Sequence, residues 1–379
     1  MSAIKRRLRR LEGALRTRSL RLLGALVPPR SAASADPSRP RRVLFVRYDA
    51  IGDMVLSTGF LRRLKEAHPA AEIDVVASPM NAVVLEGNPH VSRVFIHRRG
   101  SVSDLVRAFR RLPARRYEAA VDGLALLPRV NVDTAVLMIA SRAPRRVGAG
   151  GRVDDFIFTD RERPPARPGA HFIDVLATLA RPFGIDPEVG DWRPSLALTG
   201  AERERAAAIW GEAGAARAAM GRGDGEVRLL VNLSAAHPRR RWPDERFAAV
   251  IDRARRADER LRVVVLGAPS EWDSVRRVAA DTGALAARTP GVRDAFALVA
   301  ESDAVLTPDT SITHAASAFA RPSVVLLPFD QAPFGPYGTP SYSVFSPDRL
   351  LESIPAEAVA EAVERMLRDL AANRVGAAT

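Results

Sequence analysis

The chain repeats one pattern twice: in each half, short apolar runs alternate with longer segments whose apolar residues have helical spacing. Such runs are typical of strands buried on both faces of a parallel sheet, with helices covering the faces. Two series of this kind predict two doubly wound α/β domains. The predicted strands are Val43–Val46, Ile73–Ala77, Arg93–Ile96 and Ala119–Asp122 in the first half, and Arg228–Leu233, Arg262–Leu266, Ala304–Leu306 and Ser323–Leu327 in the second.

The order of these segments also indicates the domain boundaries. We assign residues 1–42 to a basic arm and linker, 43–190 to an N-terminal Rossmann-like domain, 191–226 to an interdomain connector, 227–350 to a C-terminal Rossmann-like domain and 351–379 to a C-terminal helix and tail. Both domains have a size that is usual for a folding unit. Predicted helices include Met54–Leu64, His171–Phe183, Ala201–Met220, Thr310–Phe319 and Pro355–Leu370.

Asp53 lies in the turn that joins the first predicted strand to the helix Met54–Leu64, directly after Gly52. Open α/β sheets bind ligands at the carboxyl ends of their strands, so this carboxylate is placed where chemistry usually occurs. Its position suits a general base. The alternative is that Asp53 only caps the helix, since Asp is a preferred residue at helix N-termini.

A second strand-to-helix turn, in the C-terminal half, predicts a phosphate site. The amides of Thr310, Ser311 and Ile312 begin a helix rich in small residues. The first amides of a helix lack intrahelical acceptors, and the helix dipole favours negative charge there. His314 lies one turn further on, and it either faces the same site or is packed inside the helix layer.

Several motifs, in one order along the chain, resemble glycosyltransferase family 9, the bacterial group typified by the lipopolysaccharide heptosyltransferases. The family implies a GT-B fold, in which two Rossmann-like domains face a central cleft. The first domain binds the acceptor, which places Gly52 on the acceptor side, and the second binds the nucleotide-sugar. The matching motifs are AIGD at Ala50–Asp53, LRRLK at Leu61–Lys65, LEGNPHVSRVF at Leu85–Phe95, RRRWPDERFAAVID at Arg239–Asp252, VVVLGAPSEWDSV at Val263–Val275, Asp309-Thr310 and FGPYG at Phe334–Gly338.

The resemblance also implies a reaction: inverting transfer of a heptose-like sugar from a nucleotide-diphosphate sugar to a cell-envelope glycan or glycolipid. Asp53 would be the base, and Arg240, which aligns with the family's basic residue before the Trp-Pro pair, would bind the diphosphate. A solvated charge run is the alternative reading of Arg240. The expected nucleotide-sugar-binding residues are Ser234, Arg241, Glu271, Asp309, Thr310, Ser311, Ile312 and His314.

Two positions depart from the family pattern. Ser311 and Ser234 stand where the family commonly has glycine, and each adds a hydroxyl beside the expected pyrophosphate. Two other functions stay open: a GT-B epimerase or hydrolase acting on the nucleotide-sugar alone, and a non-catalytic, membrane-associated scaffold that binds the nucleotide-sugar. The presence of both Asp53 and Arg240 argues against the scaffold.

Several classes of site are excluded by the residues themselves. The chain has no cysteine, no Gly-x-Gly-x-x-Gly opening a βα unit and no P-loop. No two aspartates stand two residues apart, as the Asp-x-Asp metal motif of other glycosyltransferases requires. We therefore expect no cofactor and no metal. No run of apolar residues is long enough to span a membrane.

Positive charge is concentrated in the N-terminal arm. Residues 1–42 carry twelve lysines and arginines against two carboxylates, so +10 of the chain's +13 lies there. The apolar residues of the arm share one helical face: Ile4, Leu8, Leu11, Leu15, Leu22 and Leu26. This pattern predicts that residues 1–27 form a basic amphipathic helix on an anionic membrane. The expected location is cytoplasmic and peripheral, on the inner face of the cytoplasmic membrane.

Nucleic acid is the alternative partner of this arm, because arginine attracts any polyanion. The arm contains no aromatic residue that could stack on bases, so nucleic acid is the less favoured reading.

Overall fold

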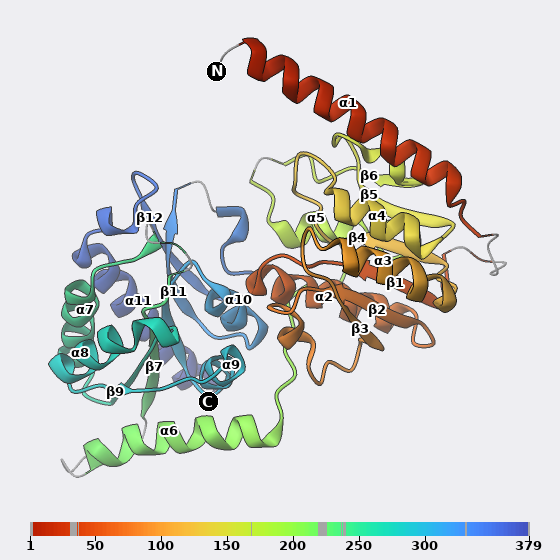
Figure 1. The fold of residues 1–379 in the computed structure, drawn as a ribbon. Coiled ribbons are helices and arrows are strands. Elements are labelled where there is room, and N and C mark those ends of the chain that lie inside the picture. The colour runs from red at the N-terminus through yellow and green to blue at the C-terminus, as the bar shows by residue number, and fades with distance from the viewer. Residues whose placement is uncertain are drawn as a thin grey trace. The chain divides into compact units, whose positions relative to one another are not determined.

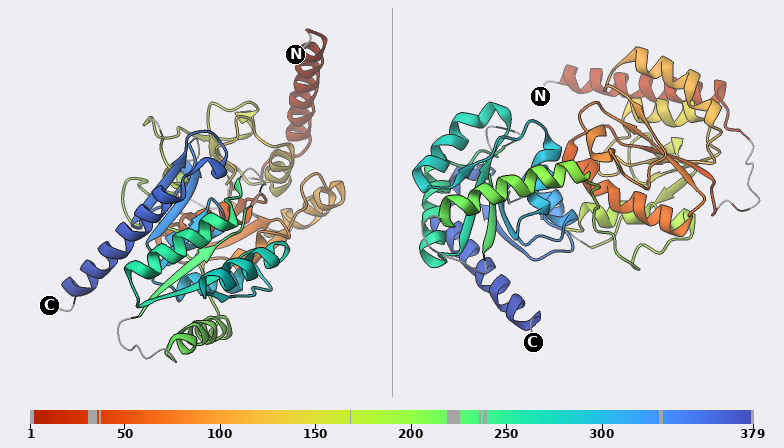
Figure 2. Two further views of the ribbon diagram at one scale, coloured as in Figure 1. Left: turned by 90° about the vertical axis from the view of Figure 1, so that its left-hand side faces the viewer. Right: turned by 90° about the horizontal axis from the view of Figure 1, so that it is seen from below.

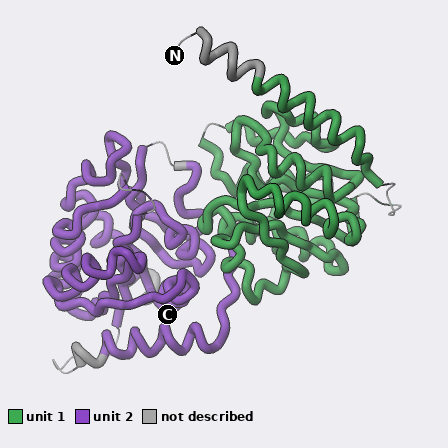
Figure 3. The backbone as a smooth tube through the Cα atoms, in the orientation of Figure 1, with its two compact units in different colours: residues 1–192 green, residues 193–379 purple. Residues whose placement is uncertain are grey.

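The computed structural model describes residues 3–30, 36, 38–167, 169–218, 226–235, 237, 240–329 and 332–377, with the side chains of 3–11, 215–218, 332 and 373–377 left aside. Residues 31–35 and 37 of the predicted linker, the predicted helix end at Met220 and Arg239 lie outside these residues. The chain forms two compact units, residues 1–192 and 193–379 (Figure 3).

Unit 1 is built on a six-stranded parallel sheet with the order β3-β2-β1-β4-β5-β6. All four predicted strands are confirmed. The sequence analysis missed β5 and β6, which have charged residues and glycine where an apolar run was sought. The strands are β1 (Arg42–Val46), β2 (Glu72–Ala77), β3 (Arg93–Ile96), β4 (Ala119–Asp122), β5 (Arg145–Ala149) and β6 (Asp160–Glu162).

Helices cover both faces of this sheet (Figures 1 and 2). On one face α3 (Val102–Arg111) packs against α4 (Val132–Ser141), and on the other α2 (Ile51–Ala67) packs against α5 (Phe172–Thr178). The predicted helix His171–Phe183 is too long, because α5 stops at Thr178 and the chain continues as the 3₁₀ turn Arg181–Phe183. Pro182 in that turn lacks the amide hydrogen that a longer helix needs.

The arm forms helix α1 (Ala3–Leu26), which lies against α4. It docks through Leu20, which is only 4% exposed and which the sequence analysis did not place on the apolar face. The predicted face points away from the unit: Leu15, Leu22 and Leu26 are 70%, 63% and 71% exposed. The helix is therefore confirmed, with one side packed on unit 1 and a leucine row left uncovered.

Unit 2 contains a second six-stranded parallel sheet, with the order β12-β11-β10-β7-β8-β9. The four predicted strands are again confirmed, which gives the two doubly wound sheets that the sequence predicts. The short β9 and the polar β12 were missed. The strands are β7 (Val227–Asn232), β8 (Leu261–Leu266), β9 (Leu285–Ala286), β10 (Ala304–Pro308), β11 (Ser323–Pro328) and β12 (Ser341–Ser346).

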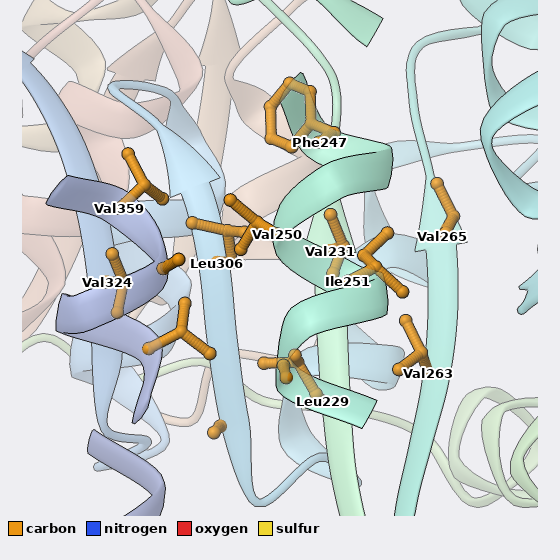
Figure 4. Close-up of a cluster of buried hydrophobic side chains, with 14 of the residues drawn as sticks. Leu229, Val231, Phe247, Val250, Ile251, Val263, Val265, Leu306, Val324 and Val359 are labelled. Carbon is orange, nitrogen blue, oxygen red and sulfur yellow. The ribbon is translucent and has the colours of Figure 1, made fainter. Parts of the chain in front are cut away.

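Six of the described helices surround this sheet, and the core lies between the strands and three of them. Phe247, Val250 and Ile251 of α7 and Val359 of α11 pack on strand residues such as Leu306 (Figure 4). On the other face α9 packs between α6 and α10. The helices are α6 (Gly200–Ala218), α7 (Asp244–Ala257), α8 (Trp272–Thr282), α9 (Val292–Ala300), α10 (Ser311–Ala318) and α11 (Ala356–Ala377), with α8 packed beside α7.

None of the described helices is long and apolar enough to cross a membrane.

Candidate active site

Each sheet reverses its strand order at one place, between β1 and β4 in unit 1 and between β7 and β10 in unit 2. At such a switch point the chain leaves two neighbouring strands toward opposite faces, so their carboxyl ends open a crevice for ligands. The candidate residues from the sequence follow these strands in both units, and we describe the two sites separately.

In unit 1, Asp53 is the third residue of α2. The N-cap of α2 is Ala50, whose side chain makes no capping bond. The Asp53 carboxylate instead pairs with Arg47, with Oδ1 lying 3.2 Å from Nη2, and its side chain is 26% exposed. Asp53 therefore does not occupy the N-cap position, and its carboxylate is held at the switch point while remaining open to solvent. Gly52 precedes it and is buried.

Arg47 is the residue around which this site is arranged, and the sequence analysis missed it. Its buried guanidinium donates two hydrogen bonds of 2.9 Å to the carboxylate of Asp49 and another to the carbonyl of Gly123, just after β4. It also lies 4.5 Å from the ring centroid of Phe172 on α5. One side chain thus links the ends of β1 and β4 to both α2 and α5. The available signal was a charged pair, Arg47 and Asp49, directly after a buried strand.

Two carboxylates therefore share one guanidinium. Burial raises the pKa of Asp49, and the negative charge of Asp53 adds to this rise, whereas Arg47 acts in the opposite direction. For Arg47, burial alone would lower the pKa, but Asp49, Asp53 and Asp122 together raise it above its ordinary value. Removing Arg47 would accordingly raise the pKa of Asp49 further.

In unit 2, polar side chains join the ends of β7 and β10. The amide of Asn232 donates to the hydroxyls of Thr307, at 2.9 Å, and Thr310, at 3.2 Å. Asn232 also accepts a hydrogen bond from the amide of Ser234. The network holds Ser234 and Thr310, both predicted ligand residues, at the same switch point.

Arg240 is the cation of this site. Its Nη1 lies 2.6 Å from Oδ2 of Asp309, which is buried, while the Arg240 side chain is 33% exposed. Asp309 therefore holds the guanidinium of Arg240 in place. Arg241 points elsewhere, since it bonds Ser274 of α8 at 2.7 Å and Asp244 at 3.4 Å.

Glu271 has a structural partner on each side. Its carboxylate accepts hydrogen bonds from the amides of Ala268, at 3.0 Å, and Ala235, at 3.3 Å. It thereby ties the loop after β8 to the loop after β7. His314 is buried within α10.

The prediction that Thr310, Ser311 and Ile312 all offer free amides is wrong. Thr310 is the N-cap of α10, and its hydroxyl accepts from the amide of Ile312 at 3.3 Å. Its own amide lies 3.5 Å from the hydroxyl of Thr313. A capping box thus satisfies two of the three amides. Of these three amides, only that of Ser311 has no acceptor among the described residues.

Comparison with known proteins identifies the architecture. The sequence model of glycosyltransferase family 9, the heptosyltransferases, matches residues 105–346. The chain belongs to this family. It is therefore a heptosyltransferase-like glycosyltransferase.

Individual relatives are distant. The glycosyltransferase is 23% identical over 318 residues to lipopolysaccharide heptosyltransferase 2 of Salmonella typhimurium, covering 80% of this chain and 86% of that protein. A family 9 glycosyltransferase from Veillonella parvula superposes with a TM-score of 0.71 at 20% identity, covering 87% of this chain and 97% of that one. An E. coli heptosyltransferase solved with ADP-2-deoxy-2-fluoro heptose superposes with a TM-score of 0.65 at 18% identity. The match covers 86% of this chain and 99% of that one. The solved structures confirm the GT-B fold.

Within the described residues of the glycosyltransferase, no group of three or more His, Asp or Glu side chains is arranged to hold a metal ion.

The Arg47 arrangement predicts opposite effects of two substitutions on the pH–rate profile of sugar transfer. Arg47→Gln removes the charge that lowers the pKa of Asp49, so the acidic limb should move to higher pH by roughly one unit. Asp49→Asn removes the carboxylate whose pKa burial raises, so the limb should move to lower pH. Thermal melting would first verify that both variants are folded. Shifts in one common direction, or none, would contradict a shared guanidinium.

Proposed function

We propose that this glycosyltransferase moves a heptose-like sugar, with inversion and without a metal, from a nucleotide-diphosphate sugar to a cell-envelope glycan or glycolipid acceptor. The observation that carries the proposal is the Asp53 carboxylate, held by Arg47 at the switch point of unit 1 and still reachable from solvent. An ADP-sugar is the first donor to test, because a relative of the same fold was solved with an ADP-heptose derivative.

The reaction needs one base and one cation. As the acceptor oxygen attacks the anomeric carbon, Asp53 takes its proton, and the bond from that carbon to the diphosphate oxygen breaks. Attack from the side opposite the diphosphate inverts the anomeric centre. The electron pair leaves with the diphosphate, whose growing charge Arg240, the free amide of Ser311 and the dipole of α10 stabilise. In this proposal no metal ion takes part in the step.

Asp53→Asn tests the assignment of the base. The variant should bind nucleoside diphosphate as the wild type does, while kcat falls by roughly 10²-fold or more, the usual scale for a lost general base. Glu66→Gln, on the same helix but away from the strand ends, is the control. Turnover of donor without acceptor should be measured in parallel, because acceptor-independent consumption would favour the epimerase or hydrolase. Near-wild-type transfer by Asp53→Asn would refute the mechanism.

Arg240→Ala tests the diphosphate site. A charge-assisted contact to phosphate contributes about 1.5–3 kcal/mol, so affinity for nucleoside diphosphate should fall by roughly 10- to 150-fold, with slower transfer. Arg241→Ala is a matched control, because its neighbouring guanidinium bonds Asp244 and Ser274 instead. Transfer should also persist in EDTA. Loss of activity in EDTA, with recovery on adding magnesium, would show that the metal-free mechanism is wrong.

We further propose that α1 attaches the enzyme to an anionic membrane, on the cytoplasmic face where a lipid-linked acceptor is presented. Its outward leucine row offers apolar area, and basic residues near an anionic leaflet contribute about 1 kcal/mol each. The opposite side of α1 is packed on unit 1, so the row is available without undocking the helix.

Replacing Leu15, Leu22 and Leu26 together by Ser should release the protein from anionic liposomes without reducing transfer to a soluble acceptor fragment, because the row is exposed. A control triple variant replaces Val189, Phe329 and Phe345 by Ser in the same way. These are exposed apolar residues outside α1. Liposome sedimentation at moderate salt measures the difference. Unchanged binding of the leucine variant, or a preference of the wild type for RNA, would refute the membrane assignment.

A further inference from the structure

A groove runs between α1 and two loops of unit 1, those that follow β4 and β5. It has a volume of about 530 Å³, within the range of roughly 300–1,000 Å³ that is usual for small-molecule sites. Small side chains of α1 are part of its lining, and the groove is open to the surrounding solvent. The lining residues are Gly13, Ala14, Thr17, Arg18, Arg21, Arg129 and Val153.

The docking of α1 fixes the shape of this groove. Arg16 donates to the carbonyl of Val130 and pairs with Asp154 at 3.3 Å, and the hydroxyl of Thr17 donates to the same carboxylate. The two loops are also joined to each other, since the amide of Val130 donates to the carbonyl of Val153 at 3.0 Å. Side chains on α1 and on the loops are thereby held in one arrangement.

The groove has an excess of positive charge. Arg18 and Arg21 enter it from α1 and Arg129 from the opposite loop. Asp154 is the nearby carboxylate, but it is buried and already serves Arg16 and Thr17, with Arg129 only at 4.0 Å. Arg21 lies over the ring of Phe156, and Arg18 has no carboxylate partner among the described residues. Cations collected in this way repel one another unless an anion lies between them.

The groove is connected to the candidate base through a short series of bonds within unit 1. Arg152 donates to the carbonyl of Arg129 at 3.3 Å and to the carboxylate of Asp122 at 2.6 Å. Asp122 ends β4, and the next residue, Gly123, accepts from Arg47, the partner of Asp53. The groove therefore belongs to the same edge of the sheet as the proposed base, the edge to which the proposed function assigns the acceptor.

We propose that this groove binds a phosphate group carried by the acceptor, with Arg18 and Arg129 as its principal contacts. Guanidinium groups approaching from two sides suit a phosphate, which can accept several charge-assisted hydrogen bonds. The phosphate belongs either to a phosphorylated sugar of the glycan or to a lipid headgroup. The inference rests on the proposed function only in calling this ligand the acceptor.

Binding without turnover tests the proposal, so its outcome is independent of whether Asp53 is the base. Full-length protein is titrated with glucose 6-phosphate and, separately, with glucose. In a second arm it is sedimented with phosphatidylcholine vesicles, with and without phosphatidic acid. The test variant is Arg18→Gln/Arg129→Gln, and the control is Arg99→Gln/Arg110→Gln, which removes equal charge from exposed positions of the same unit.

At least a tenfold loss of affinity in the test variant, with the control unchanged, supports the groove. Loss in the first arm identifies a sugar phosphate, and loss confined to the vesicle arm identifies a lipid headgroup. Wild-type binding by the test variant in both arms, or equal losses in test and control variants, would overturn the proposal. Asp53→Asn should bind both probes as the wild type does, which separates this result from a failure of the catalytic mechanism.

Discussion

The buried guanidinium of Arg47 is the interaction on which the site in unit 1 depends. A buried cation is stable only when it is paired and hydrogen-bonded, and Asp49, Asp53 and the Gly123 carbonyl meet that requirement. Satisfying it brings the ends of β1 and β4 and the first turn of α2 to one point. The position of Asp53 thus follows from the need to neutralise Arg47 as well as from the backbone turn. The interaction that stabilises the fold here also orients the proposed base.

In unit 2 an arginine is also held by a carboxylate, but it is less buried than Arg47. Arg240 is also fixed by a buried carboxylate, that of Asp309, but its guanidinium stays one-third exposed. A cation that is held by one partner and open on the other side can receive a second anion without first losing its position. The capping box of α10 has the opposite consequence, because it consumes two amides that a diphosphate could have used. In the proposed mechanism, stabilisation of the leaving diphosphate therefore depends more on Arg240 than on the N-terminus of α10.

Sequence periodicity was sufficient for the eight apolar strands and for the two doubly wound sheets, since burial on both faces requires continuous apolar runs. It could not show β5, β6, β9 and β12, which are short or carry charged and polar residues. The motifs placed Asp53, Arg240 and Thr310 in the segments that follow strands. In the structure these residues follow β1, β7 and β10. Pairings such as Arg47 with Asp49, or Arg241 with Ser274, depend on side-chain directions that spacing along the chain does not determine. The same limit explains the error over the Ile312 amide.

In helix α1, the side with the most regular apolar spacing is not the side that packs on the domain. Its leucine row gives the strongest periodicity in the arm, yet the helix packs on unit 1 through Leu20, Arg16 and Thr17. Polar contacts to Asp154 and one buried leucine are enough to dock this side, which leaves the row free. Because side chains next to the docked side form one wall of the arginine groove, membrane attachment and recognition of an anionic acceptor would act through adjacent sides of the same helix. Undocking α1 would then remove the groove while sparing the leucine row, so the two roles are separable by substitutions at Asp154.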